Sequence, residues 1–172
     1  MTTTTNTLNE VDIEAVAALI GAIQQDPTKA ATTWSSTVEW KGGFRSQAKS
    51  REFTPIPSDE PSALGGDDTA ANPVEQLLGA LGNCLAVGYA ANATAAGIEV
   101  NSLTIEVEGD LDLHAFLGIE EGHAGFSSIT AKVSIDCDAS AEKLDELHRK
   151  VISTSPVGHT LAHAIPVNVE LG

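Results

Sequence analysis

The stretch from Asn72 to Gly97, NPVEQLLGALGNCLAVGYAANATAAG, decides how the rest of the chain must fold. Between Gln76 and Ile98 the sequence contains no Asp, Glu, Lys, Arg or His. A helix over this range has no charged stripe to face water, so we expect it to be buried on every side. The remaining elements must therefore provide the surfaces that cover it.

Both ends of this helix are marked in the sequence. Asn72 suits the N-cap, Pro73 suits the first helical position, and Glu75 completes a capping box with Asn72. Gly97 favours the end of a helix because glycine readily adopts the left-handed conformation. The sequence therefore predicts one long helix with defined ends.

Composition limits the classes of partner. The chain has 172 residues and a formal net charge of -15, which argues against nucleic acids and anionic membranes as partners. A membrane span is the alternative for the uncharged run, but Asn83 and Asn92 interrupt it and no cluster of cations flanks it. The first residues, MTTTTNT, do not resemble a secretory signal, so we expect a cytoplasmic protein. With only Cys84 and Cys137 present, a disulfide framework is not expected.

The patterns on either side of the central helix predict an α+β domain. Residues 1–30 contain a Thr-rich tail, expected to be disordered, and an added amphipathic helix over residues 9–25, whereas residues 31–172 form the main domain. We expect strands at 33–40, 44–53, 103–113, 129–137 and 167–171, helices at 140–153 and 157–164, and loops at 54–71 and 117–125.

The helix expected at 140–153 has one apolar face. Leu144, Leu147, His148 and Val151 form the stripe that we expect to be buried. Sheets of this size cannot cover every side of the central helix in one chain, so the sequence predicts a dimer in which a second copy covers the other side.

Cys84, in the middle of the central helix, is either a core residue or a nucleophile. A buried free cysteine usually behaves as a small hydrophobic residue. A nucleophilic cysteine must instead be a thiolate, and a free thiol is only a few per cent thiolate at neutral pH. Cys84 lies about three turns into the helix, too far from its N-terminus for the helix dipole to assist, so a nearby cation is needed. Arg45 and Arg51 on the preceding hairpin are the candidates.

The chain resembles the superfamily of osmotically inducible protein C (OsmC) and organic hydroperoxide resistance (Ohr) proteins. The resemblance rests on DEPSALGGDDTAANPVEQLLGALGNCLAVGYAANATAAGI, on TSPV at 154–157, and on the order of elements, and it covers residues 34–172. It implies an OsmC-like fold, with sheets packed around a long helix, and an intertwined homodimer whose site is shared between subunits. In the enzymes of this superfamily a cysteine reduces organic hydroperoxides, helped by an arginine from the early hairpin and a glutamate at the start of the long helix. A second cysteine, in a CPV triplet, then forms a disulfide with it.

This chain departs from the enzymes' pattern in two places. Ser155 stands at the position of the second cysteine, and Val74 stands at the position of the glutamate. Glu75 is one position later, where a helix directs it roughly 180° away from Cys84. Glu75 is therefore a capping residue first and a catalytic candidate second.

The candidate site consequently contains Cys84 as nucleophile, Arg45 as its electrostatic partner, Glu75 and Ser155. The function expected is a thiol-dependent reduction of organic hydroperoxides that needs an external thiol and no cofactor. The alternative is a non-enzymatic homodimer that binds a small hydrophobic molecule at its interface. Two weaker possibilities remain: Cys137 as the second cysteine, and a metal ion held by His159 and His163, for which no third ligand is evident.

Overall fold

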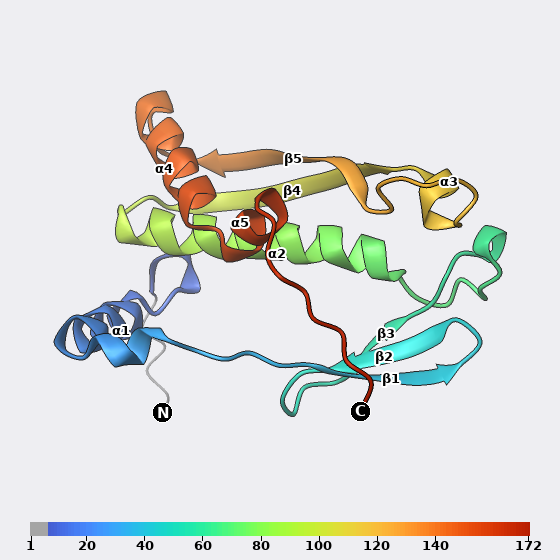
Figure 1. Ribbon diagram of the computed structural model, residues 1–172. Helices are drawn as coiled ribbons and strands as arrows, with labels where there is room; N and C mark the ends of the chain where they lie inside the picture. Colours follow the sequence, from blue (N-terminus) through green and yellow to red (C-terminus); the bar gives the residue numbers. More distant parts are fainter. Residues whose placement is uncertain (1–6) are drawn as a thin grey trace. The chain divides into compact units, whose positions relative to one another are not determined.

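The computed structural model describes residues 7–172, which form two compact units (Figure 1). One unit contains residues 7–13 and 78–172, and the other contains Glu14–Leu77. The Thr-rich tail expected to be disordered lies largely in residues 1–6, outside the described part of the chain. In residues 7–172, no helix combines the length and apolar character that crossing a membrane requires.

The fold is α+β, as predicted. Residues up to 77 form η1 (Leu8–Glu10), α1 (Ile13–Gln25), η2 (Pro27–Ala30), β1 (Thr37–Gly42), β2 (Arg45–Lys49), β3 (Ile56–Ser58) and η3 (Ser62–Leu64), together with the first turn of the long helix. The elements that follow are α2 (Pro73–Ala95), β4 (Val100–Leu111), α3 (Leu113–Phe116), β5 (Phe126–Cys137), α4 (Ala141–Thr154) and α5 (Pro156–Ala162).

Helix α2 begins and ends as its sequence predicts. The backbone N–H of Asn72 donates to the Glu75 carboxylate over 2.9 Å, and the N–H of Glu75 donates to the Asn72 side chain over 2.9 Å. This reciprocal pair is a capping box, which satisfies two N–H groups that have no partner inside the helix. At the other end Gly97 has a φ of +70°, and the N–H of Ile98 donates to the carbonyl of Ala93 over 2.9 Å. These are the features of a glycine-terminated helix.

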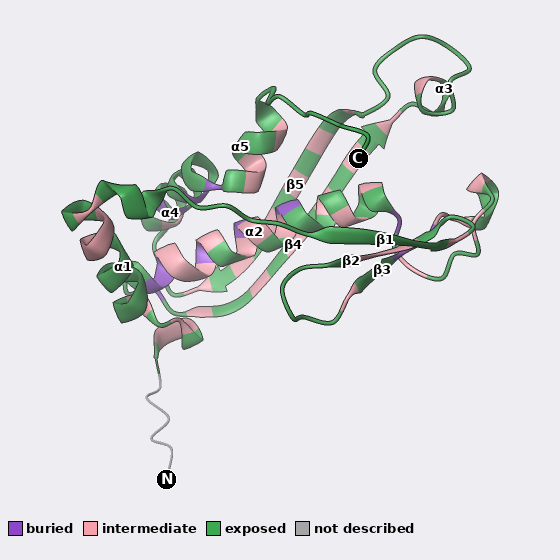
Figure 2. Ribbon diagram, turned by 60° about the horizontal axis from the view of Figure 1, so that its bottom comes forward, coloured by how far each residue is buried: buried purple, intermediate pink, exposed green. Residues whose placement is uncertain are grey.

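Within the unit of residues 7–13 and 78–172, one face of α2 is buried. Four residues at intervals of four, Leu81, Leu85, Tyr89 and Ala93, form its part of the hydrophobic core (Figure 2). On another side of the helix Val87 is 70% exposed. One sheet and one crossing helix cover only one face of a cylinder, so complete burial of α2 would need the second copy expected from the sequence, and that expectation stays a prediction.

The long strands β4 and β5 pair antiparallel and pack against the buried face of α2. Their register places Leu103 opposite Ile135 and Val107 opposite Ala131. Along both strands the apolar residues are half-buried and the polar residues are exposed, which is the pattern of a sheet with one solvated face. The expected strands are confirmed with shifted ends: β5 begins earlier, and Leu113 belongs to α3 instead of the strand.

Helix α4 covers the core from another side. Leu147 and Val151 are buried, and Ser140 caps the helix by accepting from the N–H of Lys143. A Cβ added at Gly88 of α2 would lie 2.9 Å from a methyl group of Val151, so glycine permits the two helices to approach closely.

His148 of α4 is exposed, contrary to the expected buried stripe, although its Nδ1 forms a hydrogen bond with the hydroxyl of Tyr89. Burial raises the pKa of Tyr89, so its phenol stays protonated in this contact. A buried tyrosine hydroxyl requires a polar partner, and the ring of His148 provides one from the surface of the protein.

The other unit contains a three-stranded antiparallel sheet in the order β1-β2-β3. The hairpin β1–β2 is confirmed but is shorter than expected, and β3 falls in the segment expected to be a loop. The buried Asp59 follows β3 and accepts hydrogen bonds from the backbone N–H of Glu60 and from the backbone and hydroxyl of Thr69. These contacts hold the segment that leads into α2.

Two further segments differ from expectation. The strand expected at 167–171 is absent from the described chain: the segment carries no ladder, and Val169 is 92% exposed. The helix expected at 9–25 begins only at Ile13, because Asn9 has a φ of +53°. The Asn9 side chain instead bonds Thr94, the carbonyl of Ile98 and the N–H of Val100, which fixes the turn between α2 and β4.

The capping box at the start of α2 allows the structural role of Glu75 to be measured. Glu75→Ala removes the acceptor for the Asn72 N–H and should lower the free energy of unfolding by about 1 kcal/mol. Glu75→Gln keeps an acceptor oxygen and should lower it by less than about 0.5 kcal/mol. Urea titration followed by circular dichroism measures both variants. Equal losses in the two variants would mean that the charge of Glu75, and not its hydrogen bond, stabilises the helix.

Candidate functional site

The structure brings Cys84 and Ser155 together from positions 71 residues apart in the chain. The Sγ atom of Cys84 lies 3.3 Å from the Oγ atom of Ser155. Cys84 is half-buried, at the border between the buried and the exposed faces of α2, and Ser155 is 4% exposed. The predicted nucleophile and the residue at the second cysteine's position are therefore direct neighbours.

Ser155 is held in place by its own helix. It is the N-cap of α5, and its Oγ accepts a hydrogen bond of 3.1 Å from the N–H of Gly158. Because that bond occupies a lone pair of the oxygen, the hydroxyl hydrogen remains available to donate towards the sulfur of Cys84. A hydroxyl in this position can bond a thiol, a thiolate or an oxygen atom carried by the sulfur.

An apolar cavity of about 330 Å³ lies beside Ser155. Its walls are formed by α2, α4 and α5, through Leu81, Leu85, Ile152, Ser155, Gly158, His159, Ala162 and His163. A cavity of this size and character suits a small apolar group. Ser155 lines this cavity and also contacts the sulfur of Cys84, whereas Cys84 itself is not one of the lining residues.

The two histidines of this cavity engage each other and the backbone. The rings of His159 and His163 stack with their centroids 5.4 Å apart. The Nε2 atom of His159 lies 3.1 Å from the carbonyl of Ser153, and the Nδ1 atom of His163 lies 2.9 Å from the carbonyl of His159. Among residues 7–172, no group of three His, Cys, Asp or Glu side chains is arranged to hold a metal ion.

The other candidate residues have partners of their own in the unit formed by residues 14–77. Arg45 forms an ion pair with Asp67, and the guanidinium of Arg51 lies 4.4 Å from the centre of the Phe53 ring. Glu75 forms the capping box described above. The catalytic roles of Arg45 and Glu75 stay predictions.

Cys137 lies near the C-terminal end of α2, whereas Cys84 lies in the middle of this helix. It ends β5 opposite Val100, in the strand that follows α2, and its side chain packs against the core. Cys84 precedes the end of α2 by about three turns, or roughly 16 Å at 1.5 Å per residue. Both cysteines are free. The geometry therefore favours the reading of Cys137 as a core residue.

Sequence reasoning did not identify the cavity beside Ser155. The apolar residues within 152–162 indicated a buried surface there. The walls of the cavity, however, come from three helices, and the sequence does not specify how these helices approach one another. The pairing of Cys84 with Ser155 was available only through the resemblance, because no pattern in the chain links two residues so far apart.

Known proteins give this architecture a context. Residues 65–170 match the family model described as OsmC-like protein. No curated protein matches the sequence.

Solved structures share the fold at low sequence identity. An OsmC-like protein from Mycoplasma pneumoniae is 22% identical and superposes with a TM-score of 0.66, over 76% of this chain and 88% of that one. An organic hydroperoxide resistance protein OsmC from Legionella pneumophila is 15% identical, with a TM-score of 0.59 over 76% and 91% of the two chains. An organic hydroperoxide resistance protein from Elizabethkingia anophelis is 18% identical, with a TM-score of 0.55 over 74% and 88%. Because the family model spans more than half of the sequence, this chain belongs to the OsmC-like protein family.

Proposed function

We propose that this protein reduces organic hydroperoxides through Cys84, with an external thiol as reductant. The observation that supports the proposal is the 3.3 Å contact between the Cys84 sulfur and the hydroxyl of Ser155, a residue that lines an apolar cavity. Two of the proteins that share the fold are named organic hydroperoxide resistance proteins. The cytoplasmic location expected from the sequence stays a prediction.

The reaction proceeds in two stages. The thiolate of Cys84 attacks the outer oxygen of the hydroperoxide, so that a sulfur–oxygen bond forms, the oxygen–oxygen bond breaks, and the alkoxide leaves and takes up a proton as an alcohol. A first external thiol then attacks the sulfenic acid, giving a mixed disulfide and water. A second thiol releases Cys84 and leaves the external disulfide. The apolar cavity would take the organic group, and the Ser155 hydroxyl would bond the sulfenic acid oxygen.

The experiment is consumption of cumene hydroperoxide with dithiothreitol as the thiol. Cys84→Ser should lose activity by at least about 100-fold, whereas Cys137→Ser, the matched control, should keep it, because Cys84 contacts Ser155 of the cavity wall and Cys137 packs against the core. Arg45→Ala should reduce the rate by roughly tenfold and Arg51→Ala by less, since a cation is needed to stabilise the thiolate. Equal activity of Cys84→Ser and the wild type would contradict the proposal.

The second candidate function is binding of a small hydrophobic molecule without chemistry. It is favoured by one observation: Ser155 occupies the position of the second cysteine, so no intramolecular disulfide can form there. The same experiment separates the two functions, because a binding protein would leave the hydroperoxide unchanged with every thiol.

Ser155 provides a direct test of the one-cysteine mechanism. With excess hydroperoxide and no thiol, wild-type Cys84 should gain oxygen atoms and proceed to sulfinic and sulfonic acid. Ser155→Cys should instead form a disulfide with Cys84, because the two side-chain atoms already lie 3.3 Å apart. Mass spectrometry of the oxidised peptides distinguishes these products. A quantitative disulfide between Cys84 and Cys137 in the wild type would overturn the mechanism.

We further propose that a second copy of the chain covers the exposed side of α2. Val87 on that side is 70% exposed, although the helix carries no charge there, and such a surface is normally covered. Because Cys84 lies at the edge of the same side, a second copy would approach the candidate site.

Substitution of Val87 tests the dimer. Val87→Glu would place a charge in the apolar contact and should convert a dimer to a monomer at micromolar concentration, as measured by light scattering. Ile119→Glu, at a 66% exposed position in the loop after α3, is the matched control and should not change the mass. A wild-type protein that is monomeric under these conditions would exclude the dimer.

A further inference from the structure

A second cavity lies between the C-terminal end of α2 and helix α4, and it is larger than the one beside Ser155. Its volume is about 740 Å³. It is lined by Asn92, Ala96, Ile98, Lys143, Glu146, Leu147, Arg149, Lys150 and Ser153, so it shares no residue with the apolar cavity. All of these residues belong to the same compact unit of the chain.

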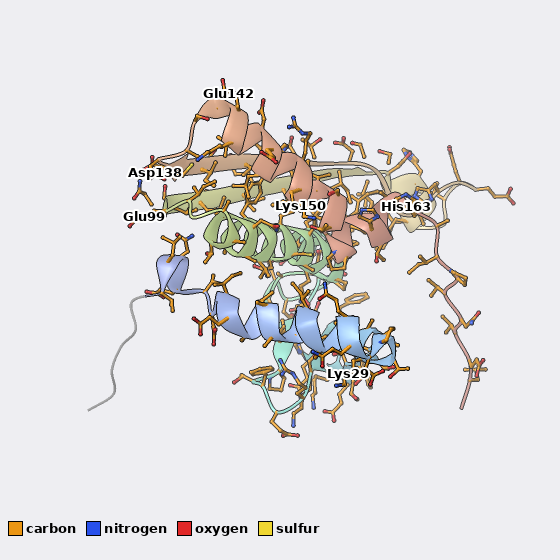
Figure 3. The ribbon with its side chains drawn as sticks, turned by 90° about the vertical axis from the view of Figure 1, so that its left-hand side faces the viewer. Lys29, Glu99, Asp138, Glu142, Lys150 and His163 are labelled. Atoms are coloured by element: carbon orange, nitrogen blue, oxygen red, sulfur yellow. The ribbon has the colours of Figure 1, made fainter. Side chains whose placement is uncertain are left out.

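The charge of this cavity opposes that of the protein. The chain carries 9 Lys and Arg residues against 24 Asp and Glu residues. Three of the cations, Lys143, Arg149 and Lys150, line the cavity, and Glu146 is the only acidic residue among its lining residues (Figure 3 labels Lys150 on α4). The lining residues therefore carry more positive than negative charge, which attracts an anion to the cavity although the protein as a whole is acidic.

Ion pairs within the described chain do not engage these cations. Lys143 is in the first turn of α4, where the helix dipole disfavours a positive charge. Glu146 and Lys150 have the spacing of an intrahelical ion pair, yet within residues 7–172 no carboxylate forms an ion pair with Lys143, Arg149 or Lys150. Their charges are therefore available to a ligand.

The floor of the cavity is apolar. Leu147 is buried, Ile98 is 4% exposed, and Ala96 adds a methyl group beside them. Asn92 and Ser153 place an amide and a hydroxyl on the walls. Cations above an apolar floor complement a molecule that has an anionic head and an apolar body, and the volume lies in the range of small-molecule sites.

We propose that this cavity binds an amphipathic organic anion, such as a carboxylate with an aliphatic body. Ala96 and the aliphatic parts of the lining side chains receive the body above the buried Leu147 and Ile98, and the cations of α4 receive the carboxylate. This site is separate from the chemistry proposed for Cys84 and does not depend on it.

The test is a nuclear magnetic resonance titration of the full chain with decanoate at low salt. The amide signals of Ile98, Leu147 and Ser153 should shift and saturate with a Kd on the order of 1 mM. Acetate, which has the head without the body, and decyltrimethylammonium, which has the body with the opposite charge, should not shift these signals at the same concentrations. Equal shifts with decyltrimethylammonium would overturn the proposal, because the cations would then not select the ligand.

Two variants and two controls locate the site. Lys143→Gln and Lys150→Gln should each weaken decanoate binding by about fivefold. Each variant removes one solvent-exposed ion pair between a lysine and the carboxylate of decanoate. Lys132→Gln is the matched control, because Lys132 lies in the same unit on β5 and pairs with Glu106 instead of lining the cavity. Cys84→Ser should bind decanoate as the wild type does. Unchanged affinity in both cavity variants, or decanoate shifts confined to other regions, would show that the cavity is not the site.

Discussion

The packing of one face of α2 on the β4–β5 hairpin is the interaction on which the described fold depends. Leu81, Leu85, Tyr89 and Ala93 recur every fourth residue, so they form one continuous line along the helix and bury it against the sheet and α4. Full burial of a large apolar side chain contributes about 1.5–3 kcal/mol, so this line contributes substantially to the stability of its unit. The packing of one face of α2 does not require the other side of the helix to lack charges. That side nevertheless has none, and this is why we propose that a second copy covers it.

Patterns in the sequence predicted those helix ends and strands whose structure depends on residues close together in the chain. The capping box of Asn72 and Glu75, the stop at Gly97 and the alternation in β4 and β5 all depend on neighbouring residues, and the structure confirms each. The failures concern segments whose structure depends on distant partners. The alternation at 167–171 is typical of a strand, but a strand requires a neighbouring ladder and the described chain provides none. Strand β3 was missed because its sequence, a short segment that contains a proline, does not resemble a strand. It becomes a strand only because β2 lies beside it.

The sequence predicted one residue of the candidate site but not the contact that this residue makes. Cys84 is evident as the one reactive side chain in an uncharged helix, but the contact with Ser155 depends on how α4 ends and α5 begins. Ser155 is both the cap of α5 and the neighbour of the sulfur, so its hydroxyl serves a structural role whether or not chemistry occurs. A cysteine at this position could accept the bond from Gly158 only weakly, because sulfur is a poorer acceptor than oxygen. Serine at position 155 is therefore consistent with the local requirements of the helix start.

The two cavities suit ligands of different charge, and their separation follows from the helix that they share. Asn92 follows Cys84 by about two turns, roughly 12 Å along α2, so the cation-lined cavity and the sulfur lie at different levels of the same element. An organic hydroperoxide is uncharged, and its approach to the apolar cavity is indifferent to a net charge of -15. An organic anion is repelled by that net charge but attracted where Lys143, Arg149 and Lys150 gather, and screening restricts their attraction to about 10 Å at ordinary salt. Under the two proposals, the same acidic surface would leave the approach of a neutral substrate unaffected and would favour an anionic ligand at the cavity between α2 and α4.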